Sequence, residues 1–181
     1  SLGFNPDNLE EAISRIPGVP GRLELINEGQ DFTVIVDYAF EPGALGKLYN
    51  TIEHLDHKRI IHVTGSTGGG RDKARRPKIG AFVAEHADVL IVTNEDPYDE
   101  DPQAIINEVA AGAERVPSET RAEVRLVLDR GEAICMAIKE ARAGDLVLVT
   151  GKGSEQRLAV AGGKLVSWDD REEVRKALRA L

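Results

Sequence analysis

Short runs of apolar residues alternate with longer stretches of helical pattern over most of this chain. Runs such as 60–64, 89–93 and 146–149 are rich in Val, Ile and Leu, and a polar or Gly-rich loop follows each one. Near-continuous apolar runs are typical of strands that are buried on both faces of a parallel sheet. Helices between such strands supply the crossovers that parallel pairing requires. We therefore predict an α/β fold: a Rossmann-like, mostly parallel sheet with helices on both faces.

The individual elements are predicted from periodicity and from capping and turn residues. Strands are expected at 22–26, 32–36, 59–64, 89–93, 124–128 and 146–149, and a small β-hairpin around 162–163. Helices are expected at 5–16 with Asn5 as N-cap, at 45–55, 73–86, 102–113 and 131–141, and from 169 onward. The Pro- and Gly-rich segment 17–21 indicates a linker, so we expect a domain of residues 22–181 after an opening helix and linker at 1–21.

Three polar loops follow predicted strand ends, at 65–73, 94–100 and 150–155. In open α/β sheets, ligands bind beyond the carboxyl ends of the strands, and those ends share one edge. The three loops should therefore open toward the same rim. This convergence predicts a small-molecule site, and it is stronger evidence than any single loop.

The loop at 65–73 is rich in glycine and ends in Arg71, Asp72 and Lys73. Backbone N–H groups of such a loop can hold an anion, and the Arg71 guanidinium suits a carboxylate or phosphate. A P-loop requires Lys and Ser or Thr where Arg71 and Asp72 stand, and a Rossmann fingerprint is interrupted by Ser66 and Thr67. The loop therefore indicates neither ATP hydrolysis nor NAD binding, and a plain strand-to-helix turn is the alternative.

The predicted rim carries charges of both signs. Arg71 and Lys73 are cations, and Glu95, Asp96 and Glu155 are anions. Opposed charges in one cleft suit a zwitterion such as an amino acid, with Arg71 meeting its carboxylate. Two alternatives stay open: the segment 95–97 could be a solvated turn before a helix, and the pair at 37–38 could contact a nucleotide or simply end a strand.

Composition excludes several classes of function. The net charge of −8 argues against a nucleic-acid groove, which needs a basic face. No signal peptide or membrane-spanning run is visible, so we expect a soluble, cytoplasmic protein. Cys135 is the single cysteine and is expected in the core. The four histidines lack metal-ligand spacing, so no metal site is predicted, and His62 is interpreted as structural.

Several ordered motifs cover the chain from residue 19 to the C-terminus. They are Val-Pro-Gly-Arg-Leu-Glu at 19–24, Val-Asp-Tyr-Ala-Phe-Glu-Pro at 36–42, Gly-Gly-Arg-Asp-Lys at 69–73 with Arg-Pro at 76–77, Glu-Asp-Pro-Tyr at 95–98, and Gly-Lys-Gly-Ser-Glu at 151–155. This series resembles the C-terminal domain of the Mur ligases. The most similar branch is that of the tripeptide synthetases, which add the third residue of the peptidoglycan stem peptide.

The resemblance implies roles for named residues. Arg22, Asp37 and Tyr38 would contact ATP, and the incoming amino acid would be bound by Arg71, Glu95, Asp96, Pro97, Tyr98, Gly151 and Glu155. The family uses ATP and Mg²⁺ to make an acyl phosphate on a UDP-N-acetylmuramoyl dipeptide, which the amine of an amino acid then attacks. This chain lacks a P-loop and a UDP-binding domain, so the resemblance implies a fragment in which 1–21 is the tail of the central ATPase domain.

As such a fragment, the chain is expected to contain no catalytic residue, to bind neither ATP nor metal by itself, and to be a monomer. It departs from the family at Phe40 and Ser154, which replace His, and at Tyr98, which replaces the Arg of diaminopimelate-adding members. Diaminopimelate is therefore not the expected substrate. Two rival hypotheses are a free-standing Rossmann-like binding module and a regulatory domain with a non-functional site.

Overall fold

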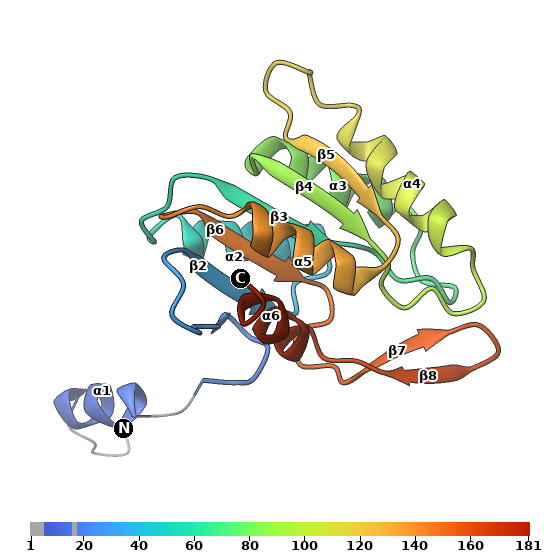
Figure 1. The fold of residues 1–181 in the computed structure, drawn as a ribbon. Helices are drawn as coiled ribbons and strands as arrows, with labels where there is room; N and C mark the ends of the chain where they lie inside the picture. Colours follow the sequence, from blue (N-terminus) through green and yellow to red (C-terminus); the bar gives the residue numbers. More distant parts are fainter. Residues whose placement is uncertain (1–5, 16–17) are drawn as a thin grey trace.

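A six-stranded sheet forms the centre of the molecule, which we describe from a computed structural model over residues 6–15 and 18–181. The strand order is β1-β2-β6-β3-β4-β5, and only β1 runs antiparallel to its neighbour (Figure 1). The strands are β1 (Glu24–Leu25), β2 (Thr33–Asp37), β3 (Ile60–Thr64), β4 (Val89–Thr93), β5 (Glu123–Val127) and β6 (Leu146–Thr150). The predicted α/β fold with a mostly parallel sheet is confirmed.

Helices cover both faces of this sheet. The helices of the described residues are α1 (Pro6–Ser14), α2 (Pro42–Ile52), α3 (Arg75–His86), α4 (Pro102–Ala113), α5 (Arg130–Glu140) and α6 (Asp170–Leu178), and all but α1 pack on the sheet. The side chains of α2, α3 and α4 form one apolar cluster with one face of the sheet, and those of α5 and α6 form a second cluster with the other face. Helix α1 lies apart from the sheet (Figure 1).

The central strands are largely apolar because both of their faces are covered, although β3 also buries His62. Along β6, Leu146 and Leu148 enter the first cluster, whereas Val147 and Val149 enter the second. Every residue of β3, β4 and β6 is buried. Consecutive strand side chains point to opposite faces, so burial on both faces demands an unbroken apolar run. This is why the sequence pattern predicted these strands well.

A small hairpin follows β6 and lies beside the main sheet. It pairs β7 (Arg157–Val160) with β8 (Lys164–Ser167) in antiparallel register around Gly162 and Gly163, as predicted. Both glycines have positive φ, at 72° and 67°, which the tight turn needs. The chain then enters α6, whose N-cap Asp169 accepts a hydrogen bond from the Arg171 backbone N–H.

Some predicted boundaries were wrong. The strand at 22–26 shrinks to Glu24–Leu25, because Leu23 has a positive φ of 46° and turns the chain. Leu55 lies beyond the end of α2 and is 39% exposed, so it is not on the helix's buried face. Cys135 is only half-buried at the edge of the second cluster. The Asn5 cap lies outside the described residues.

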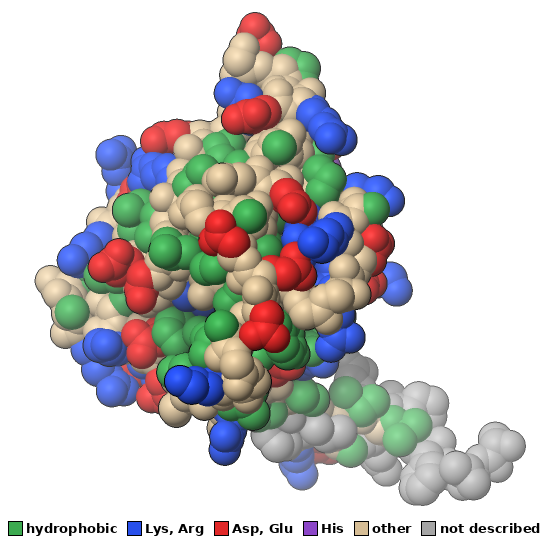
Figure 2. Space-filling view, turned by 90° about the vertical axis from the view of Figure 1, so that its right-hand side faces the viewer, with side chains coloured by type: hydrophobic (Ala, Val, Ile, Leu, Met, Phe, Trp, Pro, Cys, Tyr) green, Lys and Arg blue, Asp and Glu red, His purple; other side chains and the backbone are tan. Residues whose placement is uncertain are grey.

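The surface mixes residue types. On the face in Figure 2, acidic and basic side chains are interspersed with apolar ones. Within residues 6–15 and 18–181, no helix is both long enough and apolar enough to cross a membrane.

Helices α3 and α4 touch through two glycines, which gives a stability prediction. A Cβ on Gly80 would lie 1.8 Å from the Val109 carbonyl oxygen, and one on Gly112 would lie 1.9 Å from that of Pro77. We expect Gly80→Ala to lower the free energy of unfolding by about 2 kcal/mol, because the helices must separate. Gly46→Ala in α2, with no atom within 4 Å, should instead raise it by about 0.5–1 kcal/mol. Urea denaturation measures both, and equal effects would contradict the packing argument.

Candidate functional site

The three predicted loops meet at the carboxyl edge of β3, β4 and β6. The Gly68 N–H donates to the Asp96 carbonyl at 2.9 Å, which joins the first loop to the second. The Lys152 ammonium lies 2.6 Å from the Asp96 carboxylate, which joins the second loop to the third. A Cβ on Gly65 would fall 2.4 Å from the Thr93 carbonyl oxygen, so glycine permits the close approach. The predicted convergence on one rim is confirmed.

Lys152 is the centre of the rim's charge network. Lys152 is only 1% exposed, and its ammonium forms ion pairs with the Asp96 carboxylate at 2.6 Å and with the Glu155 carboxylate at 2.7 Å. Burial alone would lower the pKa of Lys152, but hydrogen bonds to the two carboxylates outweigh burial and raise that pKa. Asp96 is held in turn by the Ala159 N–H at 2.7 Å. The site therefore contains a permanently charged lysine that orders two carboxylates.

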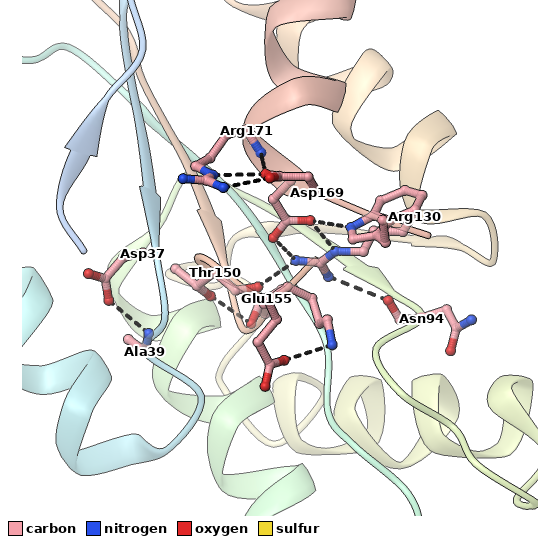
Figure 3. A network of polar contacts seen from close by, with 12 residues as sticks. Asp37, Ala39, Asn94, Arg130, Thr150, Glu155, Asp169 and Arg171 are labelled. Carbon is pink, nitrogen blue, oxygen red and sulfur yellow. Dashed lines mark hydrogen bonds and ion pairs between the residues drawn. The ribbon is translucent and has the colours of Figure 1, made fainter. Parts of the chain in front are cut away.

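A line of contacts continues from Glu155 toward the start of the domain. The Tyr38 hydroxyl donates to Glu155 at 3.1 Å, and the Arg22 guanidinium lies 4.2 Å from the centre of the Tyr38 ring. One carboxylate oxygen of Asp37 accepts a hydrogen bond from the Leu23 backbone N–H. The other accepts from the Ala39 backbone N–H (Figure 3). Asp37 thus fixes the turn that carries Arg22, while the exposed Arg22 keeps its donors available.

Glu95 lies beneath this network. It is 2% exposed, and a Cβ on Gly151 would fall 2.0 Å from its Oε2, so only glycine fits above it. Within the described residues Oε2 has no hydrogen-bond partner. Burial raises the pKa of Glu95 to about 7, although the charges of Arg130 and Lys152 act in the opposite direction. Glu95 therefore lies under the rim rather than on its open surface.

The hairpin and the second loop enclose a pocket beside Lys152. The Tyr98 N–H donates to the Ala159 carbonyl at 3.1 Å, and the Gly162 N–H donates to Asp99 at 2.7 Å. The pocket has a volume of about 410 Å³ and an open mouth. Its lining includes Tyr98, Lys152, Glu155, Arg157, Ala159 and Leu165. A side chain of amino-acid size fits such a space.

Arg71 and Lys73 lie on the exposed part of the first loop. Lys73 pairs with Glu100 at 2.9 Å. The Arg71 backbone N–H donates to the Gly68 carbonyl, and no ion pair holds its side chain in the part of the chain that the structure describes. Pro97 is buried between the loops. Of the predicted residues, the structure joins Arg22, Tyr38, Glu155 and Asp96 into one network, whereas no contact ties the Arg71 side chain to them.

The sequence model of the family described as "Mur ligase, glutamate ligase domain" matches residues 21–153. The chain belongs to this Mur ligase family.

Similar proteins support the assignment. The chain is 42% identical to a UDP-N-acetylmuramoyl-L-alanyl-D-glutamate–2,6-diaminopimelate ligase of Syntrophomonas wolfei, covering 98% of itself and 35% of that protein. It is 46% identical to a UDP-N-acetylmuramyl-tripeptide synthetase of Roseiflexus, covering 94% of itself and 33% of that protein. A solved diaminopimelate ligase superposes with a TM-score of 0.79 at 30% identity, over 98% of this chain and 35% of the other. The chain thus spans about a third of the length of these Mur ligases.

The sequence-based prediction of the site missed two residues that shape it. Lys152 was not among the predicted binding residues, although its position between two glycines could have signalled a fixed side chain. Arg76 was not considered as a site residue, yet it is 1% exposed and donates to the Thr67 carbonyl and to Glu100. Arg76 thereby holds the glycine loop. No local pattern distinguishes such a buried arginine from the solvated charges beside it.

Within 6–15 and 18–181, no group of three or more His, Cys, Asp or Glu residues is close enough to hold an ion. His62 is fully buried and contacts the Tyr49 and Thr150 hydroxyls, each at 2.9 Å, so it is structural as predicted.

Proposed function

We propose that this chain is the amino-acid-binding domain of an ATP-dependent amide ligase that extends the peptidoglycan stem peptide. The observation that carries the proposal is the continuous line of contacts from Arg22 through Tyr38, Glu155 and Lys152 to Asp96. This line connects the residues expected near ATP with those expected near the amino acid. The names of the relatives support the same function, and their greater length would accommodate the remaining domains.

The amino acid would occupy the rim beside the hairpin. Arg71 would bind its α-carboxylate, since its guanidinium is exposed and not held by an ion pair among the described residues. Asp96 and Glu155 would place negative charge near the amino acid's ammonium group. The side chain would enter the pocket lined by Tyr98 and Lys152. Because Tyr98 argues against diaminopimelate, lysine is the first candidate for the added amino acid, and diaminopimelate, which the name of one relative contains, is the alternative.

ATP would bind at the other end of this line of contacts, near Arg22. The exposed Arg22 guanidinium, stacked on Tyr38, offers donors to phosphate oxygens, and Asp37 holds its turn in place. When bound with Mg²⁺ in the complete ligase, ATP supplies the phosphoryl group that activates the acceptor's carboxylate. This chain's residues would orient the amine and shield the reaction from water, and they would close onto the nucleotide from one side.

The reaction is tested with the complete protein that carries this chain. Phosphate release from ATP should require both UDP-N-acetylmuramoyl dipeptide and an amino acid, and the 181-residue chain by itself should release none. Turnover by the isolated chain would contradict its role as one domain of a ligase. Binding of amino acids without any dependence on the dipeptide would favour a free-standing binding module.

Arg71→Ala gives a prediction for the complete enzyme. Loss of a charge-assisted contact of about 1.5–3 kcal/mol should raise the KM of the amino acid roughly 10- to 100-fold. The KM of ATP should stay unchanged. Arg115→Ala is the matched control, because Arg115 is exposed beyond the C-terminal end of α4 at the opposite edge of the sheet. An unchanged amino-acid KM in Arg71→Ala would remove Arg71 from the site.

A further inference from the structure

Arg130 and Asp170 form a buried ion pair directly behind the rim. Arg130 is the first residue of α5 and Asp170 the first residue of α6, and they are 2% and 0% exposed. The guanidinium donates from Nε to one carboxylate oxygen at 2.8 Å and from Nη2 to the other at 2.7 Å. The Trp168 indole N–H donates to the same carboxylate at 2.8 Å. The pair therefore fixes the starts of two helices relative to each other.

The same guanidinium also holds the roots of two site loops. Its Nη2 donates to the Thr150 carbonyl at 2.8 Å, and its Nη1 lies 3.4 Å from the Asn94 carbonyl (Figure 3). Thr150 is the last residue of β6 and directly precedes Gly151, whereas Asn94 directly precedes Glu95. One buried side chain thus sets where both loops leave the sheet.

The two loops that Arg130 holds, which follow Asn94 and Thr150, have little room to move. Gly151 has a φ of 109° and lies against the Glu95 carboxyl, where a Cβ would come within 2.0 Å of Oε2. Lys152 follows Gly151 directly and pairs with Glu155 in the same loop, so a displacement of the Thr150 carbonyl moves both charged groups. Movement of the Asn94 carbonyl likewise moves Asp96, the partner of Lys152.

Packing alone does not explain a charged pair here. A buried ion pair is often no more stabilising than apolar residues of similar volume, because both charges lose their hydration. An arginine fork, however, supplies several donors in fixed directions, which a lysine or an apolar side chain does not. Burial opposes the charge on Arg130, but Asp170 outweighs it and raises the pKa of Arg130 above its ordinary range.

We propose that Arg130, held by Asp170, is a positioning residue that sets the geometry of the amino-acid site through the Asn94 and Thr150 carbonyls. The proposal rests on the proposed function for its link to the amino acid. Its structural part, control of the two loops by Arg130, stands independently of the reaction.

The decisive variant is Arg130→Lys in the complete protein. Lysine keeps the charge and can pair with Asp170, but its single ammonium cannot reach both carbonyls and both carboxylate oxygens. We expect the KM of the amino acid to rise at least tenfold, with the KM of ATP unchanged. The matched control is Arg125→Lys, since Arg125 pairs with Glu123 and Glu140 and has no hydrogen bond or ion pair to the rim loops in the described part of the chain.

Backbone amide exchange gives a readout that does not depend on activity. In Arg130→Lys, exchange at 95–98 and 151–155 should become at least tenfold faster, while exchange in the centre of β3 stays unchanged. Unchanged loop exchange overturns the proposal whether or not the protein is a ligase. Faster loop exchange with an unchanged amino-acid KM overturns the link to the amino-acid site. If the unmodified protein shows no amino-acid-dependent ATP cleavage, the proposed function fails, and the exchange data alone decide whether Arg130 positions the loops.

Discussion

Replacing Lys152 with methionine is expected to lower the free energy of unfolding by about 3 kcal/mol, near the usual cost of removing one partner of a buried ion pair. Methionine keeps much of the aliphatic stem but leaves the carboxylates of Asp96 and Glu155 without their shared cation. Most of the cost should come from Asp96, because its side chain is 11% exposed whereas that of Glu155 is 42% exposed and can turn to water.

Urea denaturation near pH 7 measures this loss. Lys164→Met on β8 is the control, because Lys164 is exposed and its loss should change stability by no more than about 0.5 kcal/mol. The double variant Lys152→Met/Asp96→Asn separates charge from packing. It should recover most of the lost stability, since asparagine carries no charge and can still accept the Ala159 N–H. Strictly additive losses in the double variant would contradict an origin in the unpaired carboxylate.

The sequence predicted the sheet and the meeting of the loops because both depend on local pattern and on one general rule. Buried parallel strands require unbroken apolar runs, and their carboxyl ends must share an edge. Asp101 and Pro102 likewise predicted the start of α4, where the Asp101 carboxylate accepts the Gln103 N–H at 3.0 Å. The residues that predict these strands and this helix start lie within the elements themselves or directly beside them.

The interior of the site could not be predicted in the same way. Arg130 and Asp170 are 40 residues apart, and each stands in a charged segment typical of a solvated helix start. Their pairing exists only because α5 and α6 pack on the same face of the sheet. The burial of Glu95 likewise depends on Gly151, which arrives from a distant strand. Such contacts follow from tertiary packing, which local periodicity does not encode.

Glu95 should make stability depend on pH in the direction opposite to most carboxyl groups. Its pKa is raised from 4.5 to about 7 in the folded state, so the folded protein holds a proton that the unfolded chain has lost between those values. Stability from this group is fully present below pH 4.5 and is lost as the pH rises through 7. A shift of this size corresponds to about 3 kcal/mol.

The contribution of Glu95 is isolated by comparing the wild type with Glu95→Gln, because His62 acts in the opposite sense. Burial lowers the pKa of His62 to about 3, so its stabilising effect is lost as the pH falls from 6.5 toward 3. His62 contributes equally to both proteins, so its contribution cancels in the difference between the unfolding free energies of Glu95→Gln and the wild type. We expect this difference to move in favour of the variant by about 3 kcal/mol between pH 4.5 and 7.5. The exposed Glu53→Gln is the control for the Glu-to-Gln change itself. A difference for Glu95→Gln that does not change with pH would contradict the raised pKa of Glu95.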